Sequence, residues 1–183
     1  MSQTYNTQND LLLNNLLEFY KCNNNMDNML KIINGESRIS LRIIDWFATN
    51  YAKKYYTVYQ LQGTENRFKV YNDYKLKLKA YQKRRFDPFC RWERITVPYN
   101  ENSHIQTTIG QLNFFKWALE NNVIDYIEQN YANIEKDMNN RNSTSKNKAI
   151  DAKNKTRKKR EELSVSATKS IKKEKVEIIV KFD

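Results

Sequence analysis

The stretch SLRIIDWFATNYAKKY, residues 40–55, sets the expected fold because its apolar side chains recur at the spacing of an α-helix. One stripe along this helix contains five of them: Ile43, Ile44, Phe47, Tyr51 and Tyr55. Trp46 and Ala48 lie beside the stripe and widen it, which is typical of a helix buried on much of its surface. We therefore predict that this helix is central to the core, with Ser40 as its N-cap.

Working outward, the same spacing predicts four further helices, over residues 10–21, 26–33, 109–120 and 123–138. The expected caps are Asp10 for the first, Gly35 after the second and Thr107 or Thr108 before the third. The last two helices would form an αα-hairpin across the turn ENN. A helix-turn-helix is the alternative for this pair, but the net charge of residues 95–140 is −4, which favours a scaffold role.

Strand signals are fewer and shorter. Residues 57–61 and 67–71, rich in Thr, Val, Tyr and Phe, predict a hairpin, and RITVPY at 94–99 predicts a strand that Pro98 ends or places at a sheet edge. Residues 73–85 fit both periods. The absence of Gly and Pro and the many good helix formers favour a helix, capped by Asn72 or Asp73.

Length and composition indicate one domain with a flexible extension. The chain has 183 residues, and residues 1–140 carry almost all the apolar periodicity, so we expect a mostly helical α+β domain with a small antiparallel sheet there. Residues 141–183 form a basic, low-complexity tail, interpreted as a flexible linker or a solvated helix. It ends in KVEIIVKFD, whose alternation predicts a strand over 176–182 that pairs with the core sheet or with another protein.

The composition also limits the chemistry. Three glycines exclude a glycine-rich phosphate loop, and one His with two Cys excludes a zinc site or a His-based triad. No apolar run reaches the ~18–20 residues of a membrane span, and the polar start MSQTYNTQND does not resemble a secretory signal. We expect no metal, no cofactor and no membrane partner, and an intracellular, reducing compartment.

Catalysis has one weak candidate. Cys90 lies among arginines in RRFDPFCRWER, and neighbouring positive charge activates a thiol. A nucleophilic cysteine needs a base, however, and His104, the single histidine, is in another segment. We therefore interpret Cys90 as a small buried side chain and His104 as structural, and we expect no enzymatic activity.

Charge segregation favours an anionic partner. The net charge is +11 overall, and it is +8 in residues 53–94 and +8 in residues 141–183. In the first segment, the predicted helix carries lysines at i, i+4 and i+8 that would share one face: Lys75, Lys79 and Lys83. This surface would continue past Pro88 with four arginines, Arg84, Arg85, Arg91 and Arg94, and with Trp92 interleaved among them. In the second, the run KNKTRKKR supplies Lys155, Arg157, Lys158, Lys159 and Arg160.

Arginine forks fit phosphates, and aromatic rings stack on unpaired bases, so this pattern predicts DNA or RNA binding. An ordinary solvated charged surface is the alternative interpretation. The neighbouring Phe86 and Phe89 are expected to belong to the core rather than to the binding surface.

Three segments resemble a family of small uncharacterised proteins of nucleocytoplasmic large DNA viruses, the giant-virus group: residues 39–54, 70–95 and 107–127. The resemblance implies a viral setting, and with it a location in the host cytoplasm or nucleus, or in a virion, without secretion. It implies no mechanism, and no functional residue is carried over from it. We expect a nucleic-acid-binding accessory protein without enzymatic activity. The alternative is a virion or assembly protein that acts through protein–protein contacts, with the strand at 176–182 docking onto a viral protein.

Overall fold

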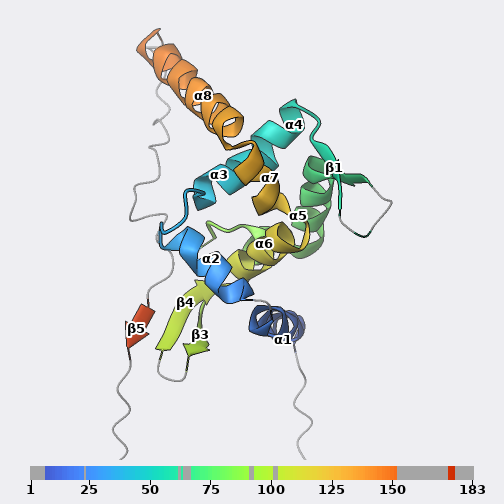
Figure 1. Ribbon diagram of the computed structural model, residues 1–183. Coiled ribbons are helices and arrows are strands. Elements are labelled where there is room, and N and C mark those ends of the chain that lie inside the picture. The colour runs from blue at the N-terminus through green and yellow to red at the C-terminus, as the bar shows by residue number, and fades with distance from the viewer. Residues whose placement is uncertain are drawn as a thin grey trace, which may run out of the picture.

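The computed structural model describes residues 7–22, 24–61, 63, 67–90, 93–100, 103–151 and 173–175. Helices dominate, and they run in the order α1 Gln8–Lys21, α2 Asn25–Ile33, α3 Leu41–Trp46, the π-helix η1 Phe47–Tyr51, α4 Ala52–Lys54, α5 Val70–Phe86, α6 Ile109–Glu120, α7 Val123–Gln129 and α8 Tyr131–Asp151 (Figure 1). The strands are β1 Val58–Gln60, β2 Arg67–Lys69, β3 Arg94–Asn100, β4 Ser103–Thr108 and β5 Lys173–Lys175. The predicted α+β class, mostly helical with small antiparallel sheets, is confirmed.

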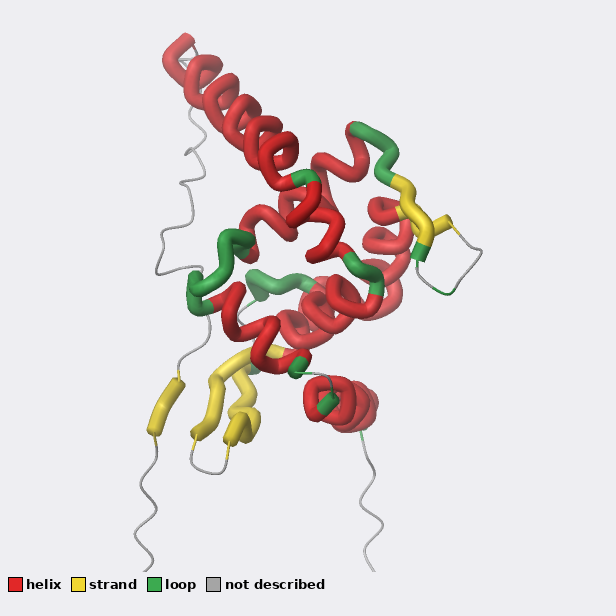
Figure 2. Tube along the Cα trace, in the orientation of Figure 1, coloured by secondary structure: helices red, strands yellow, loops and turns green. Residues whose placement is uncertain are grey.

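The centre of the fold is α6, which is buried around most of its circumference. Figure 2 shows it enclosed by other helices, and the rings of Phe114 and Phe115 are fully buried. Neighbouring helices bond to it across the core: the Tyr20 hydroxyl donates to the carbonyl of Leu112 at 2.6 Å. Trp117 Nε1 donates to the Asp73 carboxylate of α5 at 2.7 Å. These contacts fix α1 and α5 against α6.

The stretch 40–55 forms a helix, as predicted, but not a uniform one. Ser40 caps it, with its hydroxyl accepting from the Ile43 amide at 3.3 Å, and Ile44 and Phe47 are fully buried. The α-helical pattern gives way to the π-helix η1 before α4 completes the segment. The predicted apolar stripe does not extend to Tyr55, whose side chain is 51 % exposed because the helix leaves the core at that end.

Several expected boundaries move. Thr7, not Asp10, caps α1, and a capping box joins the two residues. The residue before α5 is Lys69, not Asn72 or Asp73. The helix therefore begins earlier than predicted, and the second hairpin strand is shortened to β2. Gly35 follows α2 at φ +76°, the left-handed C-cap position predicted for it.

The predicted helix 123–138 is two helices, because the backbone turns at Asn130 between α7 and α8. α8 then continues past residue 140 into the predicted tail as far as Asp151. Figure 1 shows this part of α8 projecting away from the other helices.

Both sheets are antiparallel and small. β1 pairs with β2, and the second sheet has the order β3-β4-β5, with Val97 opposite Ile105. Pro98 lies in β3, an edge strand, as its missing amide requires. The strand predicted over 176–182 lies outside the described residues; β5, directly before it, pairs with β4 through Ser103, His104 and Ile105.

Candidate functional site

Most of the predicted cations in residues 53–94 lie at the surface. Lys75, Lys79, Lys83 and Arg84 are exposed on α5, Arg85 is half-buried there, and Arg94 is exposed at the start of β3. We call these six residues the α5 basic surface. Arg91 and Trp92 lie outside the described residues, as do the tail cations Lys155, Arg157, Lys158, Lys159 and Arg160.

The predicted continuous stripe of Lys75, Lys79 and Lys83 is wrong. Gln82 interrupts α5 with φ 62° and ψ 164°, a conformation far from helical. A break of this kind changes the direction of the chain, so the i, i+4, i+8 relation holds only as far as Lys79. The α5 basic surface therefore has two parts: Lys75 and Lys79 before the break, and Lys83, Arg84, Arg85 and Arg94 after it.

The start of α6 holds the second part in place. Gly110 packs so closely on this turn that a Cβ there would lie 2.9 Å from the carbonyl oxygens of Arg84 and Asp87. Asn113 Nδ2 donates to the Arg85 carbonyl at 2.9 Å. Arg94 pairs with Thr108, the N-cap of α6, and so reaches the same end of that helix. Backbone anchoring thus leaves these cationic side chains at the surface on a fixed turn.

The nearby phenylalanines belong to the core, as expected. Phe86 is fully buried and meets Phe114 edge-on, with ring centroids 5.8 Å apart. Phe89 is half-buried and packs against the core. Neither ring is available to stack on a base, so in its described part this surface is suited to phosphate contacts.

Asp45 of α3 lies in the electrostatic field of the same turn. Burial, reinforced by the negative charge of Asp87, raises the pKa of Asp45 to about 6, against a smaller opposing effect of Lys83. Lys83 Nζ lies 3.5 Å from an Asp87 carboxylate oxygen, while the other Asp87 oxygen accepts from the Phe89 amide at 2.8 Å. The sequence spacing gave no indication that Asp45 and Asp87 interact.

Cys90 and His104, the two residues considered for catalysis, lie in different segments of the fold. Cys90 is half-buried rather than buried as predicted, and the two cysteines are unpaired. His104 is half-buried in β4, and its buried Nδ1 has no hydrogen-bond partner in the described part of the chain. Among the residues that the structure describes, no group of three or more His, Cys, Asp or Glu side chains is placed to hold a metal ion.

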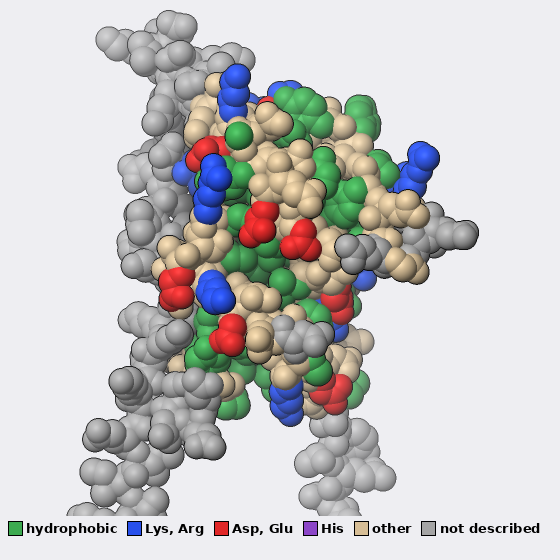
Figure 3. Space-filling view, in the orientation of Figure 1, with side chains coloured by type: hydrophobic (Ala, Val, Ile, Leu, Met, Phe, Trp, Pro, Cys, Tyr) green, Lys and Arg blue, Asp and Glu red, His purple; other side chains and the backbone are tan. Residues whose placement is uncertain are grey.

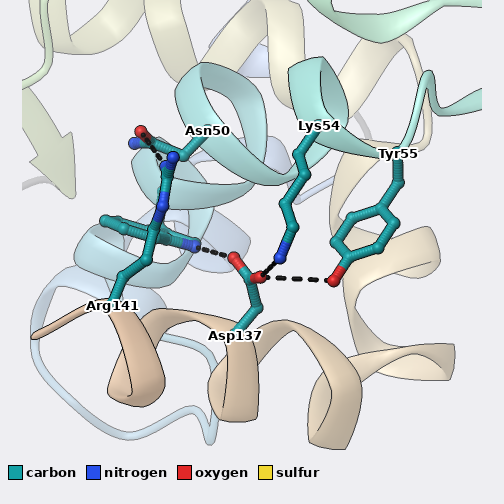
Figure 4. A network of polar contacts seen from close by, with 6 residues as sticks. Asn50, Lys54, Tyr55, Asp137 and Arg141 are labelled. Carbon is teal, nitrogen blue, oxygen red and sulfur yellow. Dashed lines mark hydrogen bonds and ion pairs between the residues drawn. The ribbon is translucent and has the colours of Figure 1, made fainter. Parts of the chain in front are cut away.

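A second polar site, which the sequence did not reveal, surrounds Asp137 of α8 (Figure 4). Its carboxylate, with a side chain only 6 % exposed, accepts from three donors on α3 and at the end of α4. Lys54 Nζ lies 2.5 Å from Oδ1, the Tyr55 hydroxyl 3.3 Å from the same oxygen, and Trp46 Nε1 3.2 Å from Oδ2. These bonds fasten α8 to the preceding helices.

The protonation states in this network follow from those donors. Burial alone would raise the pKa of Asp137, but the hydrogen bonds from Lys54 and Trp46 outweigh it and hold the pKa below its usual range. The same hydrogen bond from Lys54 to Asp137 raises the pKa of the Lys54 ammonium. Both groups are therefore charged at neutral pH.

The network forms the floor of an open depression of about 480 Å³ between η1, α4 and α8, which we call the α8 depression. Its lining combines cations, tyrosines and amides around the one carboxylate: Tyr51, Lys54, Tyr55, Asn133, Lys136, Asp137, Asn140 and Arg141. Arg141 donates to Asn50 Oδ1 at 3.1 Å and lies over the Trp46 ring. Only the exposed run of Tyr and Lys at 53–56 could have hinted at this site in the sequence.

The face that includes α2 and α7 is different. Figure 3 shows acidic and basic side chains interspersed there, without a large patch of one sign. The positive net charge is therefore not spread uniformly over the surface. No helix in the described part of the chain has the length and apolar character needed to cross a membrane.

Comparisons with known proteins point to giant viruses. The sequence profile of a family of unknown function (DUF7197) matches residues 2–182. A relative, "Uncharacterized protein L507" of Acanthamoeba polyphaga mimivirus, is 46 % identical over 127 residues, which cover 66 % of this chain and 48 % of the relative. The match thus spans about half the length of that protein. No solved structure matches the chain. The resemblance to giant-virus proteins is confirmed, and a viral protein is supported.

Proposed function

Since the chain belongs to the family of unknown function DUF7197, with a mimivirus relative, we propose that it is a viral accessory protein that binds nucleic acid through the α5 basic surface. α5 carries six basic side chains and a single acidic one. That one acid, Asp73, accepts from Trp117 in the core and leaves the helix strongly positive. This excess of positive charge on one helix, which the Lys83–Asp87 pair offsets only in part, is the observation that carries the proposal.

The arrangement favours phosphate contact over base reading. Lys75 and Lys79 are exposed four residues apart, and like charges at that spacing repel each other by a few tenths of a kcal/mol. An anion placed between them relieves that repulsion. Because the nearby rings are in the core, we expect binding at this surface to depend on salt and to be insensitive to base sequence.

The experiment is a mobility-shift titration of the full chain with double-stranded and single-stranded DNA and RNA at several salt concentrations. The double variant Lys75→Glu/Lys79→Glu removes two phosphate contacts and should reduce the slope of log K against log salt by about 2. Its matched control is Lys21→Glu/Lys31→Glu, which makes the same charge change on exposed positions of α1 and α2. Equal weakening in the two variants would refute the proposed surface.

The basic tail is proposed to add affinity without adding sequence preference. Its test is the full chain with the five tail cations replaced by glutamine, because a truncation after Asp151 would also remove β5, which pairs with β4. We expect this variant to bind more weakly at low salt and to keep the same preference among sequences.

One observation favours the alternative, a virion or assembly protein. β5 is the outer strand of the order β3-β4-β5, and its outer edge carries no partner strand among the described residues. An open edge of this kind accepts a strand from another protein. Co-purification with one viral protein that survives high salt would support this function over nucleic-acid binding.

A further inference from the structure

The end of α4 presents a tyrosine where helices usually place glycine. The Thr57 amide donates to the Ala52 carbonyl at 3.1 Å, which closes the helix and puts Tyr56 in the left-handed cap position with φ 49°. Only glycine adopts this conformation without steric cost, and for other residues the cost is about 1–2 kcal/mol. The cap geometry therefore explains the backbone at Tyr56 but not the choice of side chain.

The ring of Tyr56 contributes little to the fold. Its side chain is 86 % exposed, and it has no ring or hydrogen-bond partner in the described part of the chain. Its neighbours Tyr55 and Val58 are 51 % and 42 % exposed. Tyr55 lines the α8 depression, and Tyr56 is the next residue along the chain, outside that lining.

The depression gathers cations, one of them over the Tyr55 ring. Asp137 holds the Lys54 ammonium at 2.5 Å and over the Tyr55 ring, yet the Lys54 side chain remains 48 % exposed, so N–H donors still face outward. Lys136 is exposed on the opposite wall, and Asn50 orients the Arg141 guanidinium. Three cations against one carboxylate leave the depression net positive.

We propose that the α8 depression binds single-stranded nucleic acid, with an unpaired base stacked on Tyr56 and adjoining phosphates held by Lys54, Lys136 and Arg141. This inference rests on the proposed function and specifies a second site with its own substrate class. A single strand fits because its bases are free to leave the stack, whereas the bases of a duplex are paired and stacked on one another. The volume of about 480 Å³ is that of a small-ligand site.

The test is fluorescence anisotropy with the full chain, a labelled single strand of about 12 nucleotides and a duplex of the same length. Tyr56→Ser should weaken single-strand binding about tenfold and leave duplex binding unchanged, because only the stacking contact is lost. Tyr56→Phe keeps the ring and should bind as the wild type does. Leu11→Ser, which removes another large exposed side chain on α1, is the matched control.

The outcomes separate this inference from the proposed function. If Tyr56→Ser binds the single strand normally while Lys75→Glu/Lys79→Glu loses affinity, the depression is not a binding site and the α5 basic surface stands. If neither single strand nor duplex binds the wild type, both proposals fail. If inorganic phosphate competes as strongly as the unlabelled strand does, phosphate contacts alone account for the affinity, and the proposed stacking contact is overturned.

Discussion

The α5 basic surface and the α8 depression are both positive, but they treat a neighbouring carboxylate in opposite ways. In the depression, Asp137 is surrounded by donors, and its pKa is lowered. Below the turn of α5, burial and the nearby Asp87 raise the pKa of Asp45 to about 6. Asp137 orients the cations around it, whereas burial of the ionised Asp45 lowers the stability of the fold. The cations of the depression are thus held in place by a carboxylate of the chain itself, whereas the cations of the α5 surface are held through their backbone.

Each region also contains one exposed residue in a strained backbone conformation. Gln82 breaks α5 and redirects the cations after it, while Tyr56 directly follows Tyr55, which lines the depression. Strain of this kind persists where a surrounding structure imposes it, and it is concentrated at functional sites. Four substitutions test whether the two regions differ as described.

The largest effect is expected from Asp137→Ala. The substitution leaves Trp46 Nε1 and Lys54 Nζ without their acceptor and loosens the attachment of α8, which should lower the free energy of unfolding by about 3 kcal/mol. Urea denaturation at pH 7 measures it. Lys136→Ala, one residue away and exposed, should change stability by less than about 0.5 kcal/mol. Equal effects from the two variants would mean that the network does not attach α8.

Asp45→Asn should instead stabilise the protein, by about 2 kcal/mol above pH 6. A carboxyl group whose pKa is raised in the folded protein makes its full contribution to stability below 3.8, its pKa in the unfolded chain. That contribution is lost as the pH rises through about 6. Unfolding free energy of the wild type should therefore fall between pH 4 and pH 6.

The pH profile of the Asp45→Asn variant is the measurement that decides. Its decline between pH 4 and pH 6 should disappear. A loss of stability below pH 4 should remain, because the lowered pKa of Asp137 belongs to a group that stabilises the fold only while ionised. An unchanged slope between pH 4 and pH 6 would contradict the role given to Asp45.

The sequence predicted the parts of the fold that depend on local periodicity. The helix over 40–55, the hairpin strands and the α6–α7 pair follow from spacing, and Ser40 and Gly35 are caps with a local chemical signature. The breaks at Gln82 and Asn130 were missed because neither Gly nor Pro marks them. At such positions tertiary packing sets the backbone conformation, as it does at the turn of Arg84, against which Gly110 packs closely.

The candidate sites divide in the same way. The cations of α5 could be predicted because they are adjacent in the sequence and because charge runs are visible without a structure. The α8 depression could not, since Asp137 and Lys54 are 83 positions apart and meet only when α8 folds back over η1. Tyr55 was assigned to the core because its spacing fits the apolar stripe, and nothing in that spacing shows where the helix leaves the core.

Gln82→Gly should raise the free energy of unfolding by about 1 kcal/mol. The conformation of Gln82, φ 62° and ψ 164°, is one that only glycine adopts readily, and its exposed side chain gives up no buried contact when removed. Thermal unfolding measures the gain. Gln82→Ala keeps a Cβ and should show none of it. If alanine and glycine give the same stability, the break in α5 is not strained.

Tyr56→Asn is expected to have the smallest effect on stability and the most informative sign. Asparagine tolerates the left-handed conformation better than tyrosine, and the exposed ring takes almost no burial with it, so stability should rise by about 0.5 kcal/mol. Affinity for a single strand should fall at the same time. Tyr56→Phe, which retains both the ring and the strain, should leave both quantities unchanged. Thermal unfolding and anisotropy on the same samples measure the two effects. A residue kept only for the fold cannot give a variant that is more stable and binds less well. A loss of stability in Tyr56→Asn would show instead that the ring supports the end of α4, and its exposure would then no longer indicate a ligand.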